Sequence, residues 1–172
     1  MPTFRYGHAS APDWRDAARS CVIQLGSGDA SLGFLYITDV LADHAAEILD
    51  WFREETGVAH WTGAVGIGVC ATGREYLDEP AMAVMVADFE VGTFRVFSGI
   101  AKAEQVDRTA LKCGNVPANF AVVHADPSNS EIPELVSKLA ERVESGFLVG
   151  GLTSSRRQNI QIADGIVEGG LS

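Results

Sequence analysis

Two similar stretches decide the fold: residues 147–172 read FLVGGLTSSRRQNIQIADGIVEGGLS, and residues 61–89 read WTGAVGIGVCATGREYLDEPAMAVMVADF. Each has an apolar strand that contains glycine, a polar turn with an arginine, and an apolar return strand. The match extends upstream, because Asp39 to Gly63 and Asp126 to Gly150 both span 24 positions and align without a gap at an offset of 87. A repeat of this length predicts a duplicated structural unit.

The extent of the repeat predicts one α/β domain made of two units. The tripeptide Thr-Phe-Arg at residues 3–5 recurs at 93–95, an offset of 90, so we place the units at residues 3–92 and 93–172. Strands and helices alternate within each unit, and a hairpin closes it, which gives the order βαβαββ. The sequence therefore predicts a mixed β-sheet with packed helices, built from two duplicated βαβαββ units.

In the first unit, apolar runs and alternation predict strands at residues 3–9, 33–38, 61–70 and 81–88, with a turn at 71–80. Helical periodicity predicts one helix that has Ser10 as its N-cap, Pro12 in its first turn and Gly26 at its end. A second helix is expected at residues 43–56. The glycines Gly63, Gly66 and Gly68 lie inside a strand, so they indicate close approach of the backbone to a neighbouring element or to a ligand, and not a dinucleotide-binding loop.

In the second unit, the same reasoning predicts strands at residues 93–98, 120–125, 147–153 and 160–168. Helices are expected at residues 101–113 and 130–144, the latter with Ser130 as its N-cap. Apolar residues in the two long helices recur at helical spacing, so each should bury one stripe on the sheet. These stripes are Leu41, Ala45, Ile48, Leu49 and Phe52 in the first unit and Ile132, Leu135, Val136, Leu139 and Val143 in the second.

Composition excludes several classes of function. The chain has 172 residues, 47% of them hydrophobic, and a net charge of −10. This acidic balance argues against nucleic acid or an anionic membrane as a partner, since both require a basic surface. Three widely spaced cysteines indicate reduced thiols, and no apolar run approaches the ~18 residues of a membrane span. We therefore expect a cytoplasmic protein.

The most polar hairpin supplies the first candidate ligand-binding residues. Thr153, Ser154, Ser155 and Arg156 bring hydroxyls and a guanidinium together, and Arg74 stands in the equivalent turn of the first unit. Arginine suits a carboxylate or phosphate, so we expect this hairpin to contact an anionic group of a ligand or of a neighbouring domain. A solvated turn, or a surface ion pair with an acidic residue, is the alternative.

Three further residues are candidates for the same site. Cys70 ends a strand near Arg74 and is either a buried, inert thiol or a nucleophile. His124 lies in an apolar strand and is either a core residue or a site residue. Asp39, like its equivalent Asp126, follows a strand and precedes a helix, where it either caps the helix or lines a site at the strand ends. The histidines form no zinc motif, and the sequence indicates no catalytic constellation and no metal site.

The quoted segments resemble one known family. SAPDWRDAARSC, LGFLYITDV, GAVGIGVCATG and GFLVGGLTSS…GIVEGGLS are similar to the N-terminal domain of FIST proteins, over nearly the whole chain. The resemblance implies a single FIST N-terminal-like domain over residues 1–172. In the family this domain normally continues into a C-terminal FIST domain, which is absent from this chain; the abrupt ending on Gly-Gly-Leu-Ser fits a longer protein.

The resemblance also implies a function. It implies a non-catalytic intracellular sensory domain that binds a small ligand such as an amino acid. The signal would pass to a histidine kinase, a chemotaxis receptor or another partner. Because some members bind haem and sense nitric oxide, a haem-binding gas sensor is the second hypothesis, with haem as the candidate cofactor. A hydrolase or transferase that uses Cys70 or a hairpin serine is the third.

Overall fold

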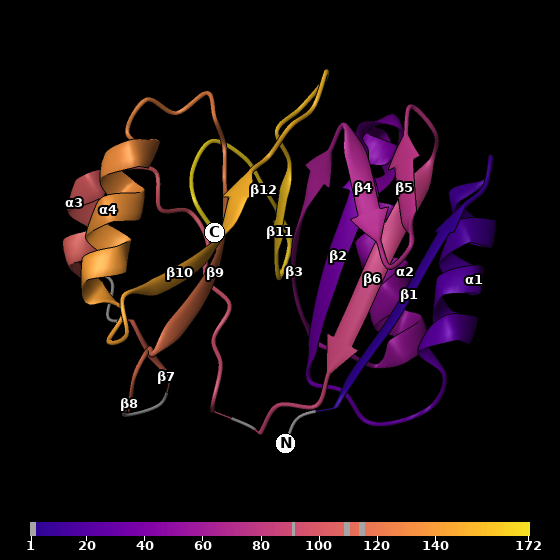
Figure 1. Cartoon of the computed structure of the whole chain (residues 1–172), viewed down its shortest axis with the longest axis horizontal. Helices are drawn as coiled ribbons and strands as arrows, with labels where there is room; N and C mark the ends of the chain where they lie inside the picture. The colour runs from indigo at the N-terminus through magenta and orange to yellow at the C-terminus, as the bar shows by residue number, and fades with distance from the viewer. Residues whose placement is uncertain (1–2, 91, 109–110, 114–115) are drawn as a thin grey trace.

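The computed structural model describes residues 3–90, 92–108, 111–113 and 116–172. It shows an α/β fold in which two sheets face each other and helices cover their outer sides (Figure 1). Helices α1 (Trp14–Leu25) and α2 (Ala45–Thr56) cover the first sheet, while α3 (Ala103–Arg108) and α4 (Ile132–Arg142) cover the second. The predicted α/β class with a mixed sheet and packed helices is confirmed.

The first sheet has six strands in the order β1-β6-β2-β3-β11-β12. Strands β2 and β3 are parallel, and every other neighbouring pair is antiparallel. The strands span β1 (Phe4–Ser10), β2 (Leu32–Thr38), β3 (His60–Gly66), β6 (Ala81–Ala87), β11 (Gln161–Ala163) and β12 (Ile166–Val167). Because β11 and β12 come from the end of the chain, the second half of the sequence completes the sheet of the first half.

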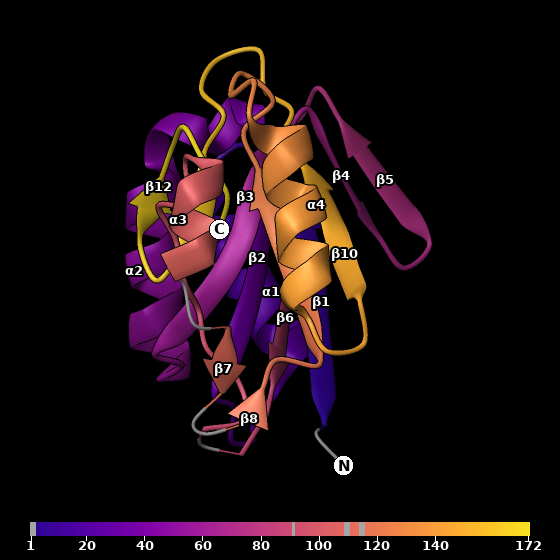
Figure 2. The same cartoon turned by 90° about the vertical axis from the view of Figure 1, so that its left-hand side faces the viewer.

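The second sheet consists of the parallel strands β9 (Phe120–Ala125) and β10 (Phe147–Leu152). Two short hairpins extend from the layers: β4 (Gly68–Ala71) with β5 (Arg74–Leu77), and β7 (Lys112–Cys113) with β8 (Val116–Pro117). Figure 2 shows α3 and α4 side by side over the second sheet, with the β4–β5 hairpin projecting at one edge.

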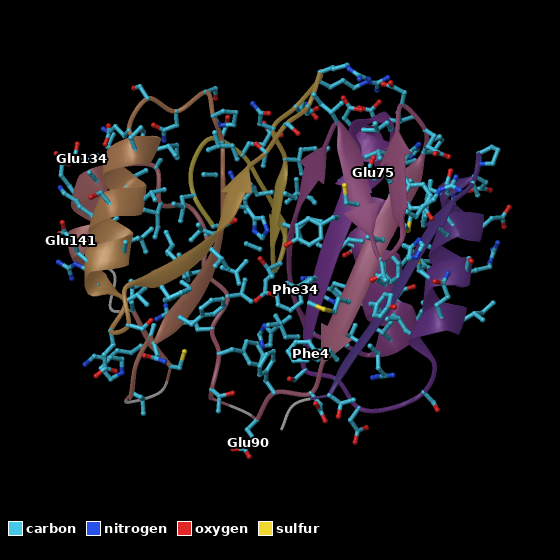
Figure 3. The ribbon with its side chains drawn as sticks, viewed as in Figure 1. Phe4, Phe34, Glu75, Glu90, Glu134 and Glu141 are labelled. Atoms are coloured by element: carbon cyan, nitrogen blue, oxygen red, sulfur yellow. The ribbon has the colours of Figure 1, made fainter. Side chains whose placement is uncertain are left out.

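Each helical layer closes its own apolar core. In the first, Phe52 of α2 is fully buried, with its ring centroid 5.6 Å from that of Trp61. In the second, Leu135 and Leu139 of α4 are fully buried and share a cluster with Leu171. The helical stripes predicted from periodicity are therefore buried, with Val136 partly exposed, while Glu134 and Glu141 lie on the outer side of α4 (Figure 3).

The two parallel pairs share one unusual contact. A Cβ added to Gly63 would lie 1.8 Å from the carbonyl oxygen of Leu35, and a Cβ added to Gly150 would lie 1.8 Å from that of Val123. Both glycines also have positive φ, 156° and 141°. The contact occurs in β2–α2–β3 and in β9–α4–β10; the two glycines are 87 residues apart, and the two carbonyl residues are 88 residues apart. Superposition of the complete units, 3–92 on 93–172, stays a prediction.

Three predicted strands are wrong in extent. Residues 93–98 form no strand, because no strand among the described residues lies beside residues 94–98 to pair with them. The nearby Ile100 makes only a single bridge, to Leu171. The expected strand 61–70 breaks at Ile67, and the expected turn contains β5. The expected strand 160–168 is a hairpin, since Asp164 adopts a φ of 51° and reverses the chain.

The predicted helix boundaries also need correction. Asp13, not Ser10, caps α1 by accepting a hydrogen bond from Arg15 N, while the Ser10 hydroxyl donates to Glu79. Pro12 therefore precedes the helix. Ser130 does not cap α4, which begins after Glu131. The helix expected at 43–56 begins after a 3-10 turn (Asp39–His44), and the helix expected at 101–113 is α3 followed by β7, with residues 109–110 outside the described part.

The glycine contacts lead to a stability prediction. Gly63→Ala and Gly150→Ala should each lower the free energy of unfolding by about 1–3 kcal/mol or more, because the new methyl group must displace a backbone carbonyl. Gly151→Ala is the matched control, since its Cβ would meet nothing within 4 Å. Urea unfolding of the three variants measures the effect. Equal midpoints for Gly150→Ala and Gly151→Ala would contradict the proposed role of this contact.

Candidate functional site

A cavity of about 360 Å³ lies between the two sheets, and we call it the inter-sheet pocket. Both halves of the chain contribute to it: the ends of β2 and β3 and the start of β4 form one wall, and β9, β10 and the loop after β10 form the other. Its lining residues are Tyr36, Ala64, Val65, Gly66, Gly68, Val69, Cys70, His124, Gly150, Gly151, Leu152 and Ser154.

Glycines lie on both walls of the inter-sheet pocket. Gly66 and Gly68 flank the break between β3 and β4, where a Cβ on Gly66 would lie 2.9 Å from the Gly68 carbonyl oxygen. Ser154 Oγ accepts a hydrogen bond from Ile67 N at 3.3 Å across this break. On the opposite wall, a Cβ on Gly151 would meet no atom within 4 Å. A ligand can therefore approach the main chain closely at Gly151, whereas protein atoms fill the space beside Gly66 and Gly68.

His124 is the central polar side chain of the inter-sheet pocket. It is 4% exposed, and its Nε2 lies 3.0 Å from the Tyr36 hydroxyl, while its Nδ1 lies 3.4 Å from Thr62 Oγ1. Burial lowers the pKa of His124 from 6.5 to about 4, so the imidazole is neutral at pH 7. Burial also raises the pKa of the Tyr36 phenol. The pair is thus an uncharged hydrogen-bonding group that links the two sheets.

Two buried aspartates hold the loops next to the inter-sheet pocket. Asp39 Oδ2 accepts a hydrogen bond from Arg156 N at 2.9 Å, so its role is to fix the loop after β10. Asp126 accepts from Ser128, Asn159 and Gly169 N. Burial alone would raise the pKa of Asp126, but these hydrogen bonds outweigh it and hold the pKa below its usual value.

The side chains of the arginine loop point to surface partners. Arg156 Nη2 lies 2.5 Å from Asp78 Oδ1, and Arg157 Nη1 lies 2.5 Å from Asp43 Oδ2. Both arginine side chains are 54% exposed, so these ion pairs contribute little to stability. An anionic ligand could engage Arg156 only in competition with Asp78.

The residues singled out from the sequence therefore fall into two groups. Cys70, His124 and Ser154 line the inter-sheet pocket together. Lying outside its lining are Thr153, Ser155, Arg74, Arg156 and Asp39. In this second group, buried Thr153 donates to the Ala125 carbonyl, Ser155 Oγ accepts from Arg157 N, and Arg74 lies 3.9 Å from Glu79. They shape the loops around the pocket and do not wall it.

Sequence reasoning missed the partners of His124. Tyr36 lies in a strand that reads as continuously apolar, and Thr62 lies in a glycine-rich one, so neither stood out. The signal that could have found them is a hydrogen-bonding side chain, such as that of Tyr36 or Thr62, inside a strand expected to be buried. A buried polar side chain requires a hydrogen-bond partner.

In the described part of the chain, the candidate nucleophile and base of the site are not joined to each other. Among the described residues, no hydrogen bond joins Cys70 to His124, and both imidazole nitrogens lie against Tyr36 and Thr62. Within the same part of the chain, no cluster of three metal-ligating side chains occurs, and no helix is long and apolar enough to cross a membrane. What the site can do is hold a small molecule by neutral hydrogen bonds and backbone contact.

Comparison with known proteins identifies a family match. The family model described as FIST N domain matches residues 31–172, which is most of the chain. A search of curated proteins found no match. The family is associated with sensing and signal transduction.

The lowered pKa of His124 predicts how stability depends on pH. The unfolded chain binds a proton at His124 as the pH falls through 6.5, whereas the folded chain does so only near 4. The free energy of unfolding should therefore decrease as the pH falls from 6.5 to 4, by about 3 kcal/mol at 1.36 kcal/mol per pKa unit. Asp126 also contributes to the free energy of unfolding, because folding lowers the pKa of its carboxyl group from 3.8. That contribution is lost only as the pH falls below 3.8, outside the window in which His124 titrates.

Denaturant midpoints between pH 7.5 and 4.5 test this prediction. His124→Gln removes the titrating group and should flatten the dependence in that window, whatever its effect at pH 7. His44→Gln is the control, since His44 is a half-exposed histidine at the surface. A slope that persists in His124→Gln would contradict the assignment.

Proposed function

Because the chain belongs to the FIST N domain family, we propose that it is a non-catalytic sensory domain that binds a small ligand in the inter-sheet pocket. The observation that carries the proposal is the construction of this cavity from both halves of the chain. Its volume of about 360 Å³ falls at the lower end of the range for small-molecule sites, and glycines lie on both walls, with open space beside Gly151.

The lining favours an amino-acid-like ligand. Among the described residues that wall the inter-sheet pocket, none has a charged side chain, since His124 is neutral. A zwitterion carries both charges itself, and backbone N–H and C=O groups at glycines can meet its carboxylate and ammonium groups. The hydroxyl groups of Tyr36 and Ser154 and the imidazole of His124 would fix its orientation.

Ligand binding would be relayed through the contacts between the halves. The Tyr36–His124 hydrogen bond crosses the inter-sheet pocket, and Asp39 of the first half fixes Arg156 of the second. A ligand that contacts both walls favours one spacing of the sheets, which changes the surface offered to a partner. We infer that the signal passes to a partner in the cytoplasm, such as a histidine kinase, a chemotaxis receptor or a C-terminal FIST domain.

The two alternative functions receive less support. His124 does not fit a haem ligand in this pocket, because it is buried and its Nε2 lies 3.0 Å from the Tyr36 hydroxyl. For a hydrolase or transferase, Cys70 and Ser154 do line the inter-sheet pocket, but Ser154 Oγ accepts from Ile67 N. Among the described residues, no hydrogen bond joins Cys70 to a base, although Glu75 lies opposite it on β5. We therefore retain the binding function.

A thermal-shift screen of amino acids and related small molecules tests the proposal. A ligand present at 100 times its dissociation constant should stabilise the folded chain by about 2.7 kcal/mol. Gly151→Leu should abolish the shift, because Gly151 lines the inter-sheet pocket and has room for a larger side chain, and Gly151→Ala should weaken it. Glu141→Gln, on the outer side of α4, is the control and should bind normally (Figure 3).

Arg156→Lys separates the pocket from the arginine loop. If the ligand lies within the inter-sheet pocket, this variant should bind it with unchanged affinity in calorimetry, because Arg156 is engaged with Asp78. Full binding by Gly151→Leu together with weakened binding by Arg156→Lys would move the ligand to the loop and overturn the proposed site.

A further inference from the structure

The hydrogen bond between Tyr36 and His124 can run in either of two directions. A neutral imidazole has one N–H and one lone pair, so either the Tyr36 hydroxyl donates to Nε2 or Nε2–H donates to the Tyr36 oxygen. The direction matters to a ligand, because Tyr36 lines the inter-sheet pocket. In the first case the hydroxyl proton is bound within the protein, and in the second case it is left for the ligand.

The surroundings of His124 favour a proton on Nε2. Nε2 lies 3.0 Å from the Tyr36 hydroxyl, whereas Nδ1 lies 3.4 Å from Thr62 Oγ1, beyond the usual N–H···O range of about 2.7–3.2 Å. The imidazole is buried, and a buried N–H without a good acceptor costs more free energy than a weakly bonded lone pair does. The proton therefore belongs on Nε2, and Nδ1 faces the Thr62 hydroxyl as an acceptor.

Tyr36 then has a hydroxyl proton that the protein does not bind. Its oxygen accepts from Nε2–H of His124, and the hydroxyl makes no other hydrogen bond among the described residues. Burial raises the pKa of the Tyr36 phenol, so the proton stays on the oxygen at pH 7. Because Tyr36 lines the inter-sheet pocket, this O–H is available as a donor to whatever occupies it.

Ser154 offers a second hydroxyl of the same kind. Its Oγ accepts from Ile67 N at 3.3 Å, and its own proton has no acceptor within the part of the chain that the structure describes. The two hydroxyls come from neighbouring positions along β3. Tyr36 is the register partner of Ala64, and a Cβ on Gly66, two residues further along the same face, would lie 3.7 Å from Ser154 Oγ. The inter-sheet pocket is thus lined by two hydroxyl donors whose oxygens already accept from the protein.

We propose that the Tyr36 and Ser154 hydroxyls both donate to the carboxylate of the ligand, and that His124 is the positioning residue that leaves the Tyr36 proton free to do so. We call the two hydroxyls the carboxylate clamp. The proposal rests on the proposed function and assigns one end of its ligand. Hydrogen bonds to an ionised acceptor are stronger than neutral ones, so two such donors suit a carboxylate in a lining without charged side chains.

Nitrogen-15 NMR of the histidines at pH 7 tests the direction of the hydrogen bond on the full chain without any ligand. His124 should carry its proton on Nε2. Tyr36→Phe removes the acceptor of that proton and should move it to Nδ1, where Thr62 can accept it. Tyr6→Phe is the matched control and should leave His124 unchanged, since Tyr6 is exposed on β1 and lies outside the pocket lining. A proton on Nδ1 in the unmutated chain would overturn the proposal.

Acetate and acetamide are the probes for the carboxylate clamp, because they have the same size and differ in the carboxylate. At pH 7 acetate should shift the amide resonance of Ile67 and should bind about tenfold more tightly than acetamide. Tyr36→Phe and Ser154→Ala should each remove most of this preference, while Ser154→Thr, which keeps the hydroxyl, should retain it. Equal affinity for the two probes would rule out the clamp.

Two further outcomes separate the carboxylate clamp from the proposed function. A ligand that lacks a carboxylate, and whose binding Gly151→Leu abolishes, would overturn the clamp and leave the sensory pocket in place. Acetate binding that depends on Tyr36 and Ser154, in a chain that binds no amino acid in the thermal-shift screen, would support the clamp and contradict the amino-acid-like ligand.

Discussion

The approach of a carbonyl oxygen to a glycine in each parallel strand pair is the constraint on which the arrangement depends. Leu35 approaches Gly63, and Val123 approaches Gly150, at distances that leave no room for a Cβ. The contact fixes the register of β2 with β3 and of β9 with β10. Because register decides which residues end each strand, it also places Gly66 and Gly151 on opposite walls of the inter-sheet pocket.

The two halves are held together by pairing and by buried carboxylates. Strand β11 adds to β3, so that Ile162 lies beside Gly63, and the side chain of buried Gln161 donates to the Gly170 carbonyl. Asp39 and Asp126 then fix the loop between β10 and β11 through Arg156 N and Asn159. These contacts anchor the loops beside both walls of the inter-sheet pocket.

The sequence predicted what local periodicity determines and missed what distant pairing determines. The buried faces of α2 and α4 follow from residues such as Phe52 and Leu139, and the ends at Gly26 and Gly57 follow from left-handed glycines. Residues 93–98 have the composition of a strand, yet a strand also needs a neighbouring strand with which to pair. In the described structure no strand lies beside these residues, and the sequence alone does not reveal this.

The same division holds for the site. His124, Cys70 and Ser154 were identified because each residue type is chemically distinctive, and the fold brings them into one cavity. Arg156 was equally distinctive, but its partner, Asp78, becomes visible only when the β4–β5 hairpin and the loop after β10 are seen together.

The addition of β11 to β3 has a consequence for the order of folding. Residues 161–163 leave the ribosome about 100 residues after the strand they cover, so the outer edge of β3 is unpaired while most of the chain is synthesised. Long-range closure of this kind slows folding and leaves an aggregation-prone edge, which the nascent chain must keep apart from other strands until residues 161–163 are made.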